Sequence, residues 1–229
     1  MTLRRGIHVK DIHFGYGQTH VLRGFTLSVE PGEFVALVGP SGAGKTSLLR
    51  CIARLVEADK GEIYAAGHAM HVLSGASLRA ARRDIAFVFQ QFNLVRRRTA
   101  FANAVSGALF DMPLWRVVSG AYSQSDHKVA LWALERVGLL RFASQRADRL
   151  SGGQQQRVAI ARALVQRSQV ILADEPVASL DPVASNGILQ LLREIAREQG
   201  VSVLCSLHQP QFVTRFADKS VDLPLKRNR

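Results

Sequence analysis

A glycine-rich loop that follows an apolar run is the first stretch of this sequence whose residues could do chemistry. The loop has the spacing G-x-x-x-x-G-K-[ST], and the apolar run before it covers residues 34–38. Glycines let backbone N–H groups curl around phosphate oxygens, and a helix that begins at Lys45 adds the positive end of its dipole. The competing interpretation is a glycine-rich turn with a chance lysine. The residues predicted to hold a nucleotide here are Gly39, Pro40, Ser41, Gly42, Ala43, Gly44, Lys45, Thr46 and Ser47.

A pair of acidic residues supplies the second candidate group. Asp174 and Glu175 follow directly after the apolar run at residues 170–173. A carboxylate at the C-terminal end of a buried strand lies at the crevice where open α/β sheets bind ligands. Asp174 is therefore predicted to hold Mg²⁺ together with Thr46, and Glu175 to polarise an attacking water. Without the glycine-rich loop, such a pair is more often a loop cap or a solvated strand end.

A serine followed by two glycines gives a second candidate anion site. Ser151, Gly152 and Gly153 precede Gln154 in a stretch that reads LSGGQ. They open a predicted helix whose first N–H groups have no partner within the helix and can bind an anion. An ordinary serine N-cap with a Gly-Gly turn is the alternative. A second anion site so far along the chain makes sense if it closes on the nucleotide of another copy.

The elements that position these motifs follow from the apolar pattern. Short strands are expected over residues 7–12, 24–29, 34–38, 85–89, 170–173 and 201–205. Helical spacing is found over residues 45–55, 128–137, 158–165 and 188–195. Because apolar strands alternate with helices, the pattern predicts an α/β fold with a mainly parallel sheet. Residues 96–149 are rich in Ala, Leu and Arg and predict a mostly helical insert.

The order and spacing of these motifs resemble those of the ATP-binding cassette (ABC) ATPases, over nearly the whole chain. The resemblance implies that Gln90 contacts the metal or the water, that Asp181 contacts the opposite subunit, and that His208 contacts the γ-phosphate. A solvated amide and a structural histidine are the competing interpretations for Gln90 and His208. Tyr16 is expected to stack on adenine, with Phe14 as the alternative. The implied catalytic residues are Glu175, His208, Lys45 and Gln90; the implied metal ligands are Thr46, Gln90 and Asp174; and the nucleotide contacts from other segments are Tyr16, Ser151, Gly152, Gly153, Gln154 and Asp181.

The same resemblance implies the architecture. It is a P-loop NTPase core of the RecA-like type with a mainly parallel sheet, an N-terminal antiparallel β subdomain and a helical subdomain that carries the LSGGQ signature. One domain is expected over residues 1–229, with the nucleotide-binding core at about 1–95 and 158–229 and the helical subdomain at about 96–157.

Composition restricts the possible partners and compartment. The chain has 229 residues with 30 Lys+Arg against 18 Asp+Glu, a net charge of +12, which points to an anionic partner such as nucleic acid, a membrane surface or polyphosphate. Two cysteines cannot form a disulfide framework, and a reducing compartment is expected. No apolar stretch predicts a membrane span. Basic clusters at residues 82–83, 96–98 and 226–229 are either a solvated face or a contact with anionic lipid.

The resemblance extends to function. A single cassette of this kind looks like the ATP-hydrolysing subunit of a bacterial importer, peripheral to the cytoplasmic face of the inner membrane, with ATP and Mg²⁺ as cofactors. The implied partners are a second copy of the chain, permease subunits and, indirectly, a periplasmic solute-binding protein. Residues 89–95, 173–182 and 206–209 look most like those of phosphonate importer ATPases. Three alternatives remain: import of another small solute, an ABC-type ATPase that acts on nucleic acid, and an inactive structural cassette. No specific nucleic acid is expected as a partner of the importer subunit.

One segment departs from the family pattern. After residue 218 the sequence lacks the further strand and glycine-rich reverse turn that are usual there. A shortened or replaced final sheet element is therefore expected, with an exposed sheet edge and lower stability.

Overall fold

Two β-sheets form the centre of the molecule. The structure is a computed structural model and describes residues 5–112, 115–116 and 120–224. The first sheet is antiparallel, with the strand order β2-β1-β4-β5. The second sheet is parallel, with the order β6-β7-β8-β3-β9. The antiparallel strands are β1 (Ile7–Tyr16), β2 (Thr19–Val29), β4 (Lys60–Ala65) and β5 (His68–Ala69). The parallel strands are β3 (Phe34–Val38), β6 (Ile85–Val88), β7 (Val170–Ala173), β8 (Ser202–Ser206) and β9 (Lys219–Asp222).

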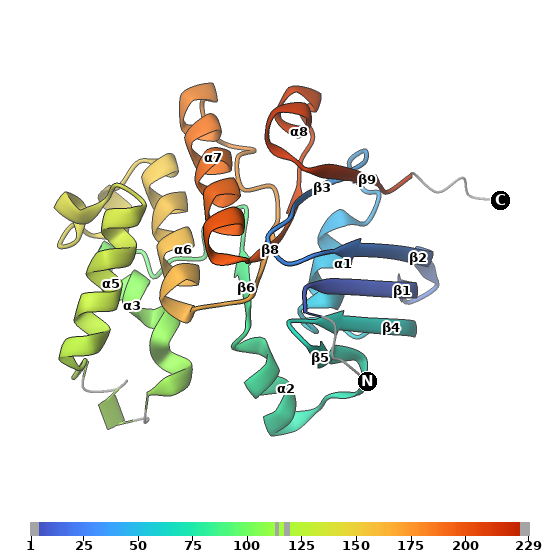
Figure 1. Cartoon of the computed structure of the whole chain (residues 1–229), viewed down its shortest axis with the longest axis horizontal. Helices are drawn as coiled ribbons and strands as arrows, with labels where there is room; N and C mark the ends of the chain where they lie inside the picture. The colour runs from blue at the N-terminus through green and yellow to red at the C-terminus, as the bar shows by residue number, and fades with distance from the viewer. Residues whose placement is uncertain (1–4, 113–114, 117–119, 225–229) are drawn as a thin grey trace.

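Helices pack around the parallel sheet (Figure 1). In that view α3, α5 and α6 gather on the side of the molecule away from the antiparallel sheet, and α1 lies beside that sheet. The α-helices are α1 (Lys45–Ile52), α2 (Gly75–Arg82), α3 (Ala100–Val105), α5 (Gln124–Arg136), α6 (Gly152–Gln166), α7 (Pro182–Gln199) and α8 (Pro210–Phe216). Short 3₁₀ turns occupy Met70–Val72, Ser106–Asp111, Leu140–Phe142 and Ala147–Arg149.

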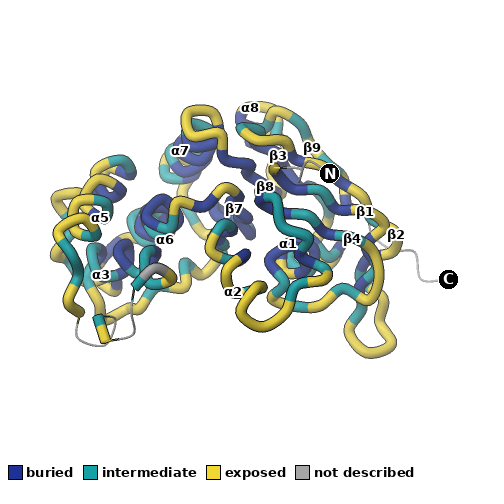
Figure 2. The backbone as a smooth tube through the Cα atoms, turned by 60° about the horizontal axis from the view of Figure 1, so that its bottom comes forward, coloured by how far each residue is buried: buried dark blue, intermediate teal, exposed yellow. Residues whose placement is uncertain are grey.

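The parallel strands are apolar throughout because both of their faces are covered. In β3, Phe34 and Ala36 belong to the core beneath α6 and α7, whereas Val35 and Leu37 belong to the core shared with α1 and the antiparallel sheet. Successive side chains of a strand point to opposite faces, so each strand contributes to both cores. Figure 2 shows the resulting pattern, with buried backbone in the central strands and in the inward-facing helices.

The α/β class, the mainly parallel sheet and the N-terminal antiparallel sheet are confirmed. Several element boundaries were wrong. The second strand begins at Thr19 rather than at residue 24, and α7 begins at Pro182, about six residues before the apolar periodicity becomes visible. Helix α6 begins at Gly152, which confirms that the serine and the two glycines open a helix, although its apolar periodicity starts only at residue 158. Both helices open with small or polar residues, which carry no periodic apolar signal. The division into subdomains at about residue 157, which falls within α6, stays a prediction.

The final sheet element, which was expected to be shortened or replaced, is present as a strand of four residues. Residues 219–222 form β9, which pairs in parallel with β3 from Val35↔Lys219 to Val38↔Asp222. Strand β9 is the edge of the parallel sheet, so the expected edge position was right. The basic segment at residues 226–229 lies outside the described residues. Within the part of the chain that the structure describes, no helix is long and apolar enough to cross a membrane.

Candidate nucleotide-binding site

The glycine-rich loop joins β3 to α1 and has a backbone that only glycine adopts easily. Gly39 and Gly44 have φ angles of 151° and 103°. A Cβ atom on Gly39 would lie 2.4 Å from the carbonyl oxygen of Leu223, and one on Gly44 would lie 2.7 Å from the Val21 side chain. Both glycines are therefore required by close contacts as well as by their φ angles. The loop rests directly on the segment that follows β9.

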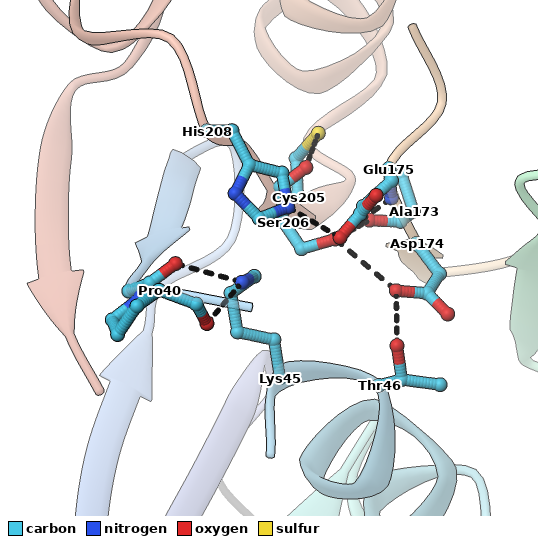
Figure 3. A network of polar contacts seen from close by, with 10 residues as sticks. Pro40, Lys45, Thr46, Ala173, Asp174, Glu175, Cys205, Ser206 and His208 are labelled. Carbon is cyan, nitrogen blue, oxygen red and sulfur yellow. Dashed lines mark hydrogen bonds and ion pairs between the residues drawn. The ribbon is translucent and has the colours of Figure 1, made fainter. Parts of the chain in front are cut away.

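Lys45 is the first residue of α1, and its ammonium group is held inside the loop (Figure 3). Nζ donates to the carbonyl oxygens of Gly39, at 2.7 Å, and Pro40, at 3.0 Å. Burial lowers the pKa of Lys45, while the nearby carboxylates of Glu175 and Asp174 oppose this shift. The ammonium group thus lies at the centre of the loop, with two carboxylates close enough to influence its charge.

Asp174 links the loop helix to the centre of the sheet. The Thr46 hydroxyl donates to Asp174 Oδ1 at 2.9 Å, and the backbone N–H of Asp174 donates to the Val88 carbonyl at 2.9 Å. Burial raises the pKa of Asp174, and the hydrogen bonds from Thr46 and Ser206 oppose that rise. A hydroxyl and a carboxylate oxygen therefore meet at one point beside the phosphate loop.

This pair of oxygen ligands fits Mg²⁺. The ion prefers oxygen donors and is usually held by one or two carboxylates together with substrate phosphates, rather than by an all-protein cage. No group of three or more His, Cys, Asp or Glu side chains that could hold a metal is found among the described residues. Thr46 and Asp174 would hold the ion, with the remaining positions left to phosphate and water.

Glu175 and His208 are in contact, although 33 positions separate them in the sequence. His208 Nε2 lies at hydrogen-bond distance from Glu175 Oε1. Glu175 has a left-handed backbone, with φ at 46°, which is uncommon for a residue other than glycine. Such a conformation persists only where the surroundings hold it, and it is common at active sites. The structure thus joins an acidic group and an imidazole at the C-terminal edge of the parallel sheet.

Ser206 also belongs to this group, and the analysis of the sequence did not single it out as a site residue. It is fully buried at the end of β8, where its Oγ accepts a hydrogen bond from the Glu175 N–H at 2.7 Å and lies 3.2 Å from Asp174 Oδ1. A hydroxyl at the C-terminal end of an otherwise apolar central strand was the available signal, because a buried polar group needs partners.

Tyr16 faces the same cleft. A cavity of about 320 Å³ is lined by Tyr16 and Val21, by the phosphate loop and by Glu175. Tyr16 is 51% exposed, whereas Phe14 is 4% exposed and packs edge-on against Tyr16 with 4.8 Å between ring centroids. Tyr16 is thus available to a ligand, and Phe14 supports it from the core.

The signature residues lie at the N-terminus of α6, away from this cleft. Ser151 Oγ accepts a hydrogen bond from the Gln154 N–H, and Gln154 Oε1 accepts one from the Ser151 N–H, which completes a capping box. A Cβ on Gly152 would contact Leu180, and one on Gly153 would contact Ala184, so the helix start packs against the beginning of α7. None of the four signature residues lines the cleft at the phosphate loop.

Gln90 and Asp181 are also separate from the cleft. Gln90 is exposed just after β6, next to the strand that carries Asp174. Asp181 caps α7 by accepting the Ala184 N–H at 2.9 Å. Of the predicted site residues, the structure brings Tyr16, the loop, Asp174, Glu175 and His208 together. It leaves Gln90, Asp181 and the signature at other places on the surface.

A phosphate-binding loop at the C-terminal edge of a parallel sheet, with acidic residues on a nearby strand, defines a P-loop nucleotide-binding protein. Similarity to known proteins identifies the family within this class. The family model for ABC transporters matches residues 22–178, and the chain belongs to that family.

Curated relatives cover most of the chain. The hypophosphite import ATP-binding protein of Stutzerimonas stutzeri is 46% identical over 217 residues, which are 95% of this chain and 64% of that protein. The phosphonates import ATP-binding proteins of Trichodesmium erythraeum and Maricaulis maris are 50% and 46% identical, over 86% and 95% of this chain. The chain spans 75% and 84% of those two proteins, and just under two thirds of the hypophosphite protein.

Solved cassettes share the fold. A dimeric ATP-binding cassette in a post-hydrolysis state, bound to ADP and phosphate, is 35% identical with a TM-score of 0.82, and the alignment covers 97% of both chains. A dimeric bacterial ABC transporter cassette is 36% identical with the same TM-score and covers 96% of this chain and 97% of its own.

Proposed function

We propose that this chain is the ATP-hydrolysing subunit of a bacterial importer that energises phosphonate uptake. The main support for this proposal is that Lys45, Thr46, Asp174 and Glu175 lie together at one cleft. The Tyr16 side chain faces the same cleft. The substrate class rests on similarity to phosphonate and hypophosphite import proteins over most of the chain. Phosphonate chemistry is not expected at this cleft, because the cleft serves the nucleotide.

The mechanism follows from what each side chain already does. Lys45 exchanges its two loop carbonyls for phosphate oxygens, and the loop N–H groups bind the remaining ones. Thr46 and Asp174 would hold Mg²⁺, which would supply neutralising charge at the phosphates. Glu175 orients the attacking water and accepts its proton. His208, which contacts the Glu175 carboxylate, is proposed to donate to the γ-phosphate.

The proposal includes a second copy of the chain. Ser151, Gly152, Gly153 and Gln154 do not line the cleft of their own chain. The N–H groups of Gly152 and Gly153, which the capping box does not use, are therefore proposed to bind the nucleotide of the partner, with Ser151 and Gln154 holding this helix start in shape. Asp181 at the start of α7 lies beside this signature and is assigned to the same interface. Two nucleotides then lie between two chains, and hydrolysis releases the closure.

The remaining partners are permease subunits, with a periplasmic solute-binding protein acting through them. Gln90 and the helical segment at about residues 96–157 are proposed to carry the closure to the permease. A hollow of about 260 Å³ at this segment is proposed as the docking place. It is lined by apolar, polar and basic side chains, namely Val95, Arg98, Ala102, Asn103, Ser106, Leu109 and Tyr122. The chain is then peripheral to the cytoplasmic face of the inner membrane.

The test is Glu175→Gln in the purified protein with ATP and Mg²⁺. Loss of the base should leave ATP binding intact, lower hydrolysis on the order of 10²- to 10⁴-fold and let dimers accumulate. Hydrolysis is measured by phosphate release and dimer formation by size-exclusion chromatography with light scattering. Glu135→Gln, an exposed site on α5, is the matched control and should behave as wild type. Full turnover by Glu175→Gln would remove Glu175 from this role.

A further inference from the structure

Two serines occupy opposite ends of β8, the strand between the phosphate-loop strand and β7. Ser202 and Ser206 are the first and last residues of this strand, and both side chains are buried. The residues between them are apolar and form part of the two cores. Ser202 Oγ donates to the Glu30 carbonyl at 3.0 Å, at the end of the sheet opposite the nucleotide cleft. Ser206 is at the cleft end, two positions before His208.

The Ser206 hydroxyl has three neighbours, all at the end of β7. It accepts from the Glu175 N–H at 2.7 Å, and it lies 3.2 Å from Asp174 Oδ1 and 3.5 Å from the Ala173 carbonyl oxygen. A hydroxyl carries a single proton and can donate to one acceptor at a time. The carboxylate is closer and charged, so Asp174 is the favoured acceptor. Figure 3 shows Ser206 between these groups.

Glu175 needs such a partner because of its backbone. Glu175 lies two positions after the end of β7 and has φ at 46°, and its N–H donates to the Ser206 hydroxyl. A left-handed conformation is unfavourable for a residue with a Cβ atom. A partly buried N–H without an acceptor would add to that cost. Ser206 satisfies this N–H, so it supports the very conformation that aims the Glu175 side chain.

We infer that Ser206 is a positioning residue for ATP hydrolysis, an inference that rests on the proposed function. Ser206 and His208 hold Glu175 at two points, the first at its backbone and the second at its carboxylate. The same Ser206 hydroxyl fixes Asp174 Oδ1 together with Thr46. One hydroxyl therefore sets the backbone of the general base and the orientation of the proposed metal ligand.

The experiment compares Ser206→Ala, Ser206→Thr and Ser202→Ala with wild type. ATP hydrolysis is measured against ATP and against Mg²⁺, and thermal unfolding is followed for each variant. Ser206→Ala should lower kcat on the order of 10- to 100-fold, because a small displacement of a reacting group has effects of this size. Its KM for ATP should change less than about twofold, since the phosphate loop is intact, and its half-saturating Mg²⁺ concentration should rise.

The other variants separate positioning from stability. Ser206→Thr keeps the hydroxyl and should recover most of kcat. Ser202→Ala removes a buried hydroxyl from the same strand and should keep the wild-type kcat, even though it also lowers the unfolding temperature. Equal kcat in Ser206→Ala and wild type would overturn the inference, as would a folded Ser206→Thr that is as slow as Ser206→Ala. A wild-type chain that hydrolyses no ATP would instead refute the proposed function.

Discussion

At the scale of single residues, buried polar groups in this chain divide into those with partners and those without. Asp174 is buried and would bind protons more readily than in water, yet the hydroxyls of Thr46 and Ser206 stabilise its charged form. Asn103 is buried as well, and its amide bonds the backbone of residues 95–99. Gln156, in the signature helix, is the contrasting case. Neither polar atom of its fully buried amide has a partner within the described residues.

Gln156→Met should therefore stabilise the chain. Methionine has a similar length and carries no group that needs a partner, so the penalty for the buried amide is removed. We expect the free energy of unfolding to rise by about 1–2 kcal/mol, which raises Tm by roughly 2–8 °C in a protein of this size. Gln155→Met is the matched control, because the Gln155 amide donates to the Leu150 carbonyl and its loss should destabilise. A lower Tm for Gln156→Met would contradict the argument.

At the scale of elements, the last strand supports the phosphate loop. The Leu223 N–H donates to the Val38 carbonyl, and the Leu223 carbonyl lies where a Cβ on Gly39 would be. Asp218 fixes the start of β9: its carboxylate accepts from the Phe34 N–H at 2.9 Å and from Arg197 at 3.0 Å. Strand β9 thereby connects α7, the start of β3 and the base of the loop.

Asp218→Asn should destabilise the chain in a pH-dependent way. Burial tends to raise the pKa of Asp218, but the Phe34 N–H and Arg197 outweigh this, and the pKa is lowered from its ordinary 3.8. The carboxylate's contribution is therefore complete above pH 3.8 and is lost as the pH falls through the lower folded pKa. We expect a loss of about 1–2 kcal/mol at pH 7, from charged hydrogen bonds on a side chain that is 28% exposed.

Urea unfolding of wild type and Asp218→Asn at pH 7 and at acidic pH measures this difference. The gap between the two curves should narrow as the pH falls. Asp222→Asn, at an exposed position of the same strand, should match wild type at every pH. A gap for Asp218→Asn that is constant with pH would show that its charge is not the cause.

Elements with a strong apolar pattern were predictable, and the others were not. Strands β3, β7 and β8 are buried on both faces, so their uninterrupted apolar runs marked them to within one residue. The start of α7 depends on the cap Asp181, whose hydrogen bond leaves no apolar period, whereas the start of α6 was predicted from Ser151 and the two glycines after it. Strand β9 has only four residues and alternates between partly buried and exposed positions, which explains why its pattern was missed.

The candidate site was predictable where the motif is contiguous in the sequence. The phosphate loop and the acidic pair were recognised because each combines its chemistry with a neighbouring strand. The support from Ser206 was not recognised, because it depends on β7 and β8 being adjacent in the sheet. Such cross-strand contacts are set by topology, which a linear reading does not specify.

At the scale of the whole molecule, the two candidate anion sites of one chain lie at different places. The phosphate loop cleft lies beside the antiparallel sheet, whereas the signature opens at the start of α6 beside α7. If each nucleotide needs one half-site from each of two chains, as proposed above, then two different inactive variants should complement each other.

Mixing Lys45→Ala with Ser151→Arg tests this arrangement. Each variant alone should be nearly inactive, because both of its composite sites carry a defect. In the mixed dimer one site combines the intact loop of Ser151→Arg with the intact signature of Lys45→Ala. In an equimolar mixture about half of the dimers are mixed, and each mixed dimer has one intact site out of two. Phosphate release should therefore recover to roughly a quarter of the wild-type rate. A mixture of Lys45→Ala with Lys10→Ala, an exposed β1 variant with both half-sites intact, gives the reference. No recovery would show that each chain acts alone.

The internal contacts of Lys45 have a consequence for the pace of turnover. Its two carbonyl partners keep the loop curled in the shape that suits phosphate, so capture of a nucleotide is expected to need little ordering of the chain. If two chains enclose each nucleotide, as proposed above, the encounter of two loaded chains is then expected to be the slow step. A scaffold that tethers the pair raises their effective concentration, and turnover is expected to respond to that tether far more than to nucleotide supply.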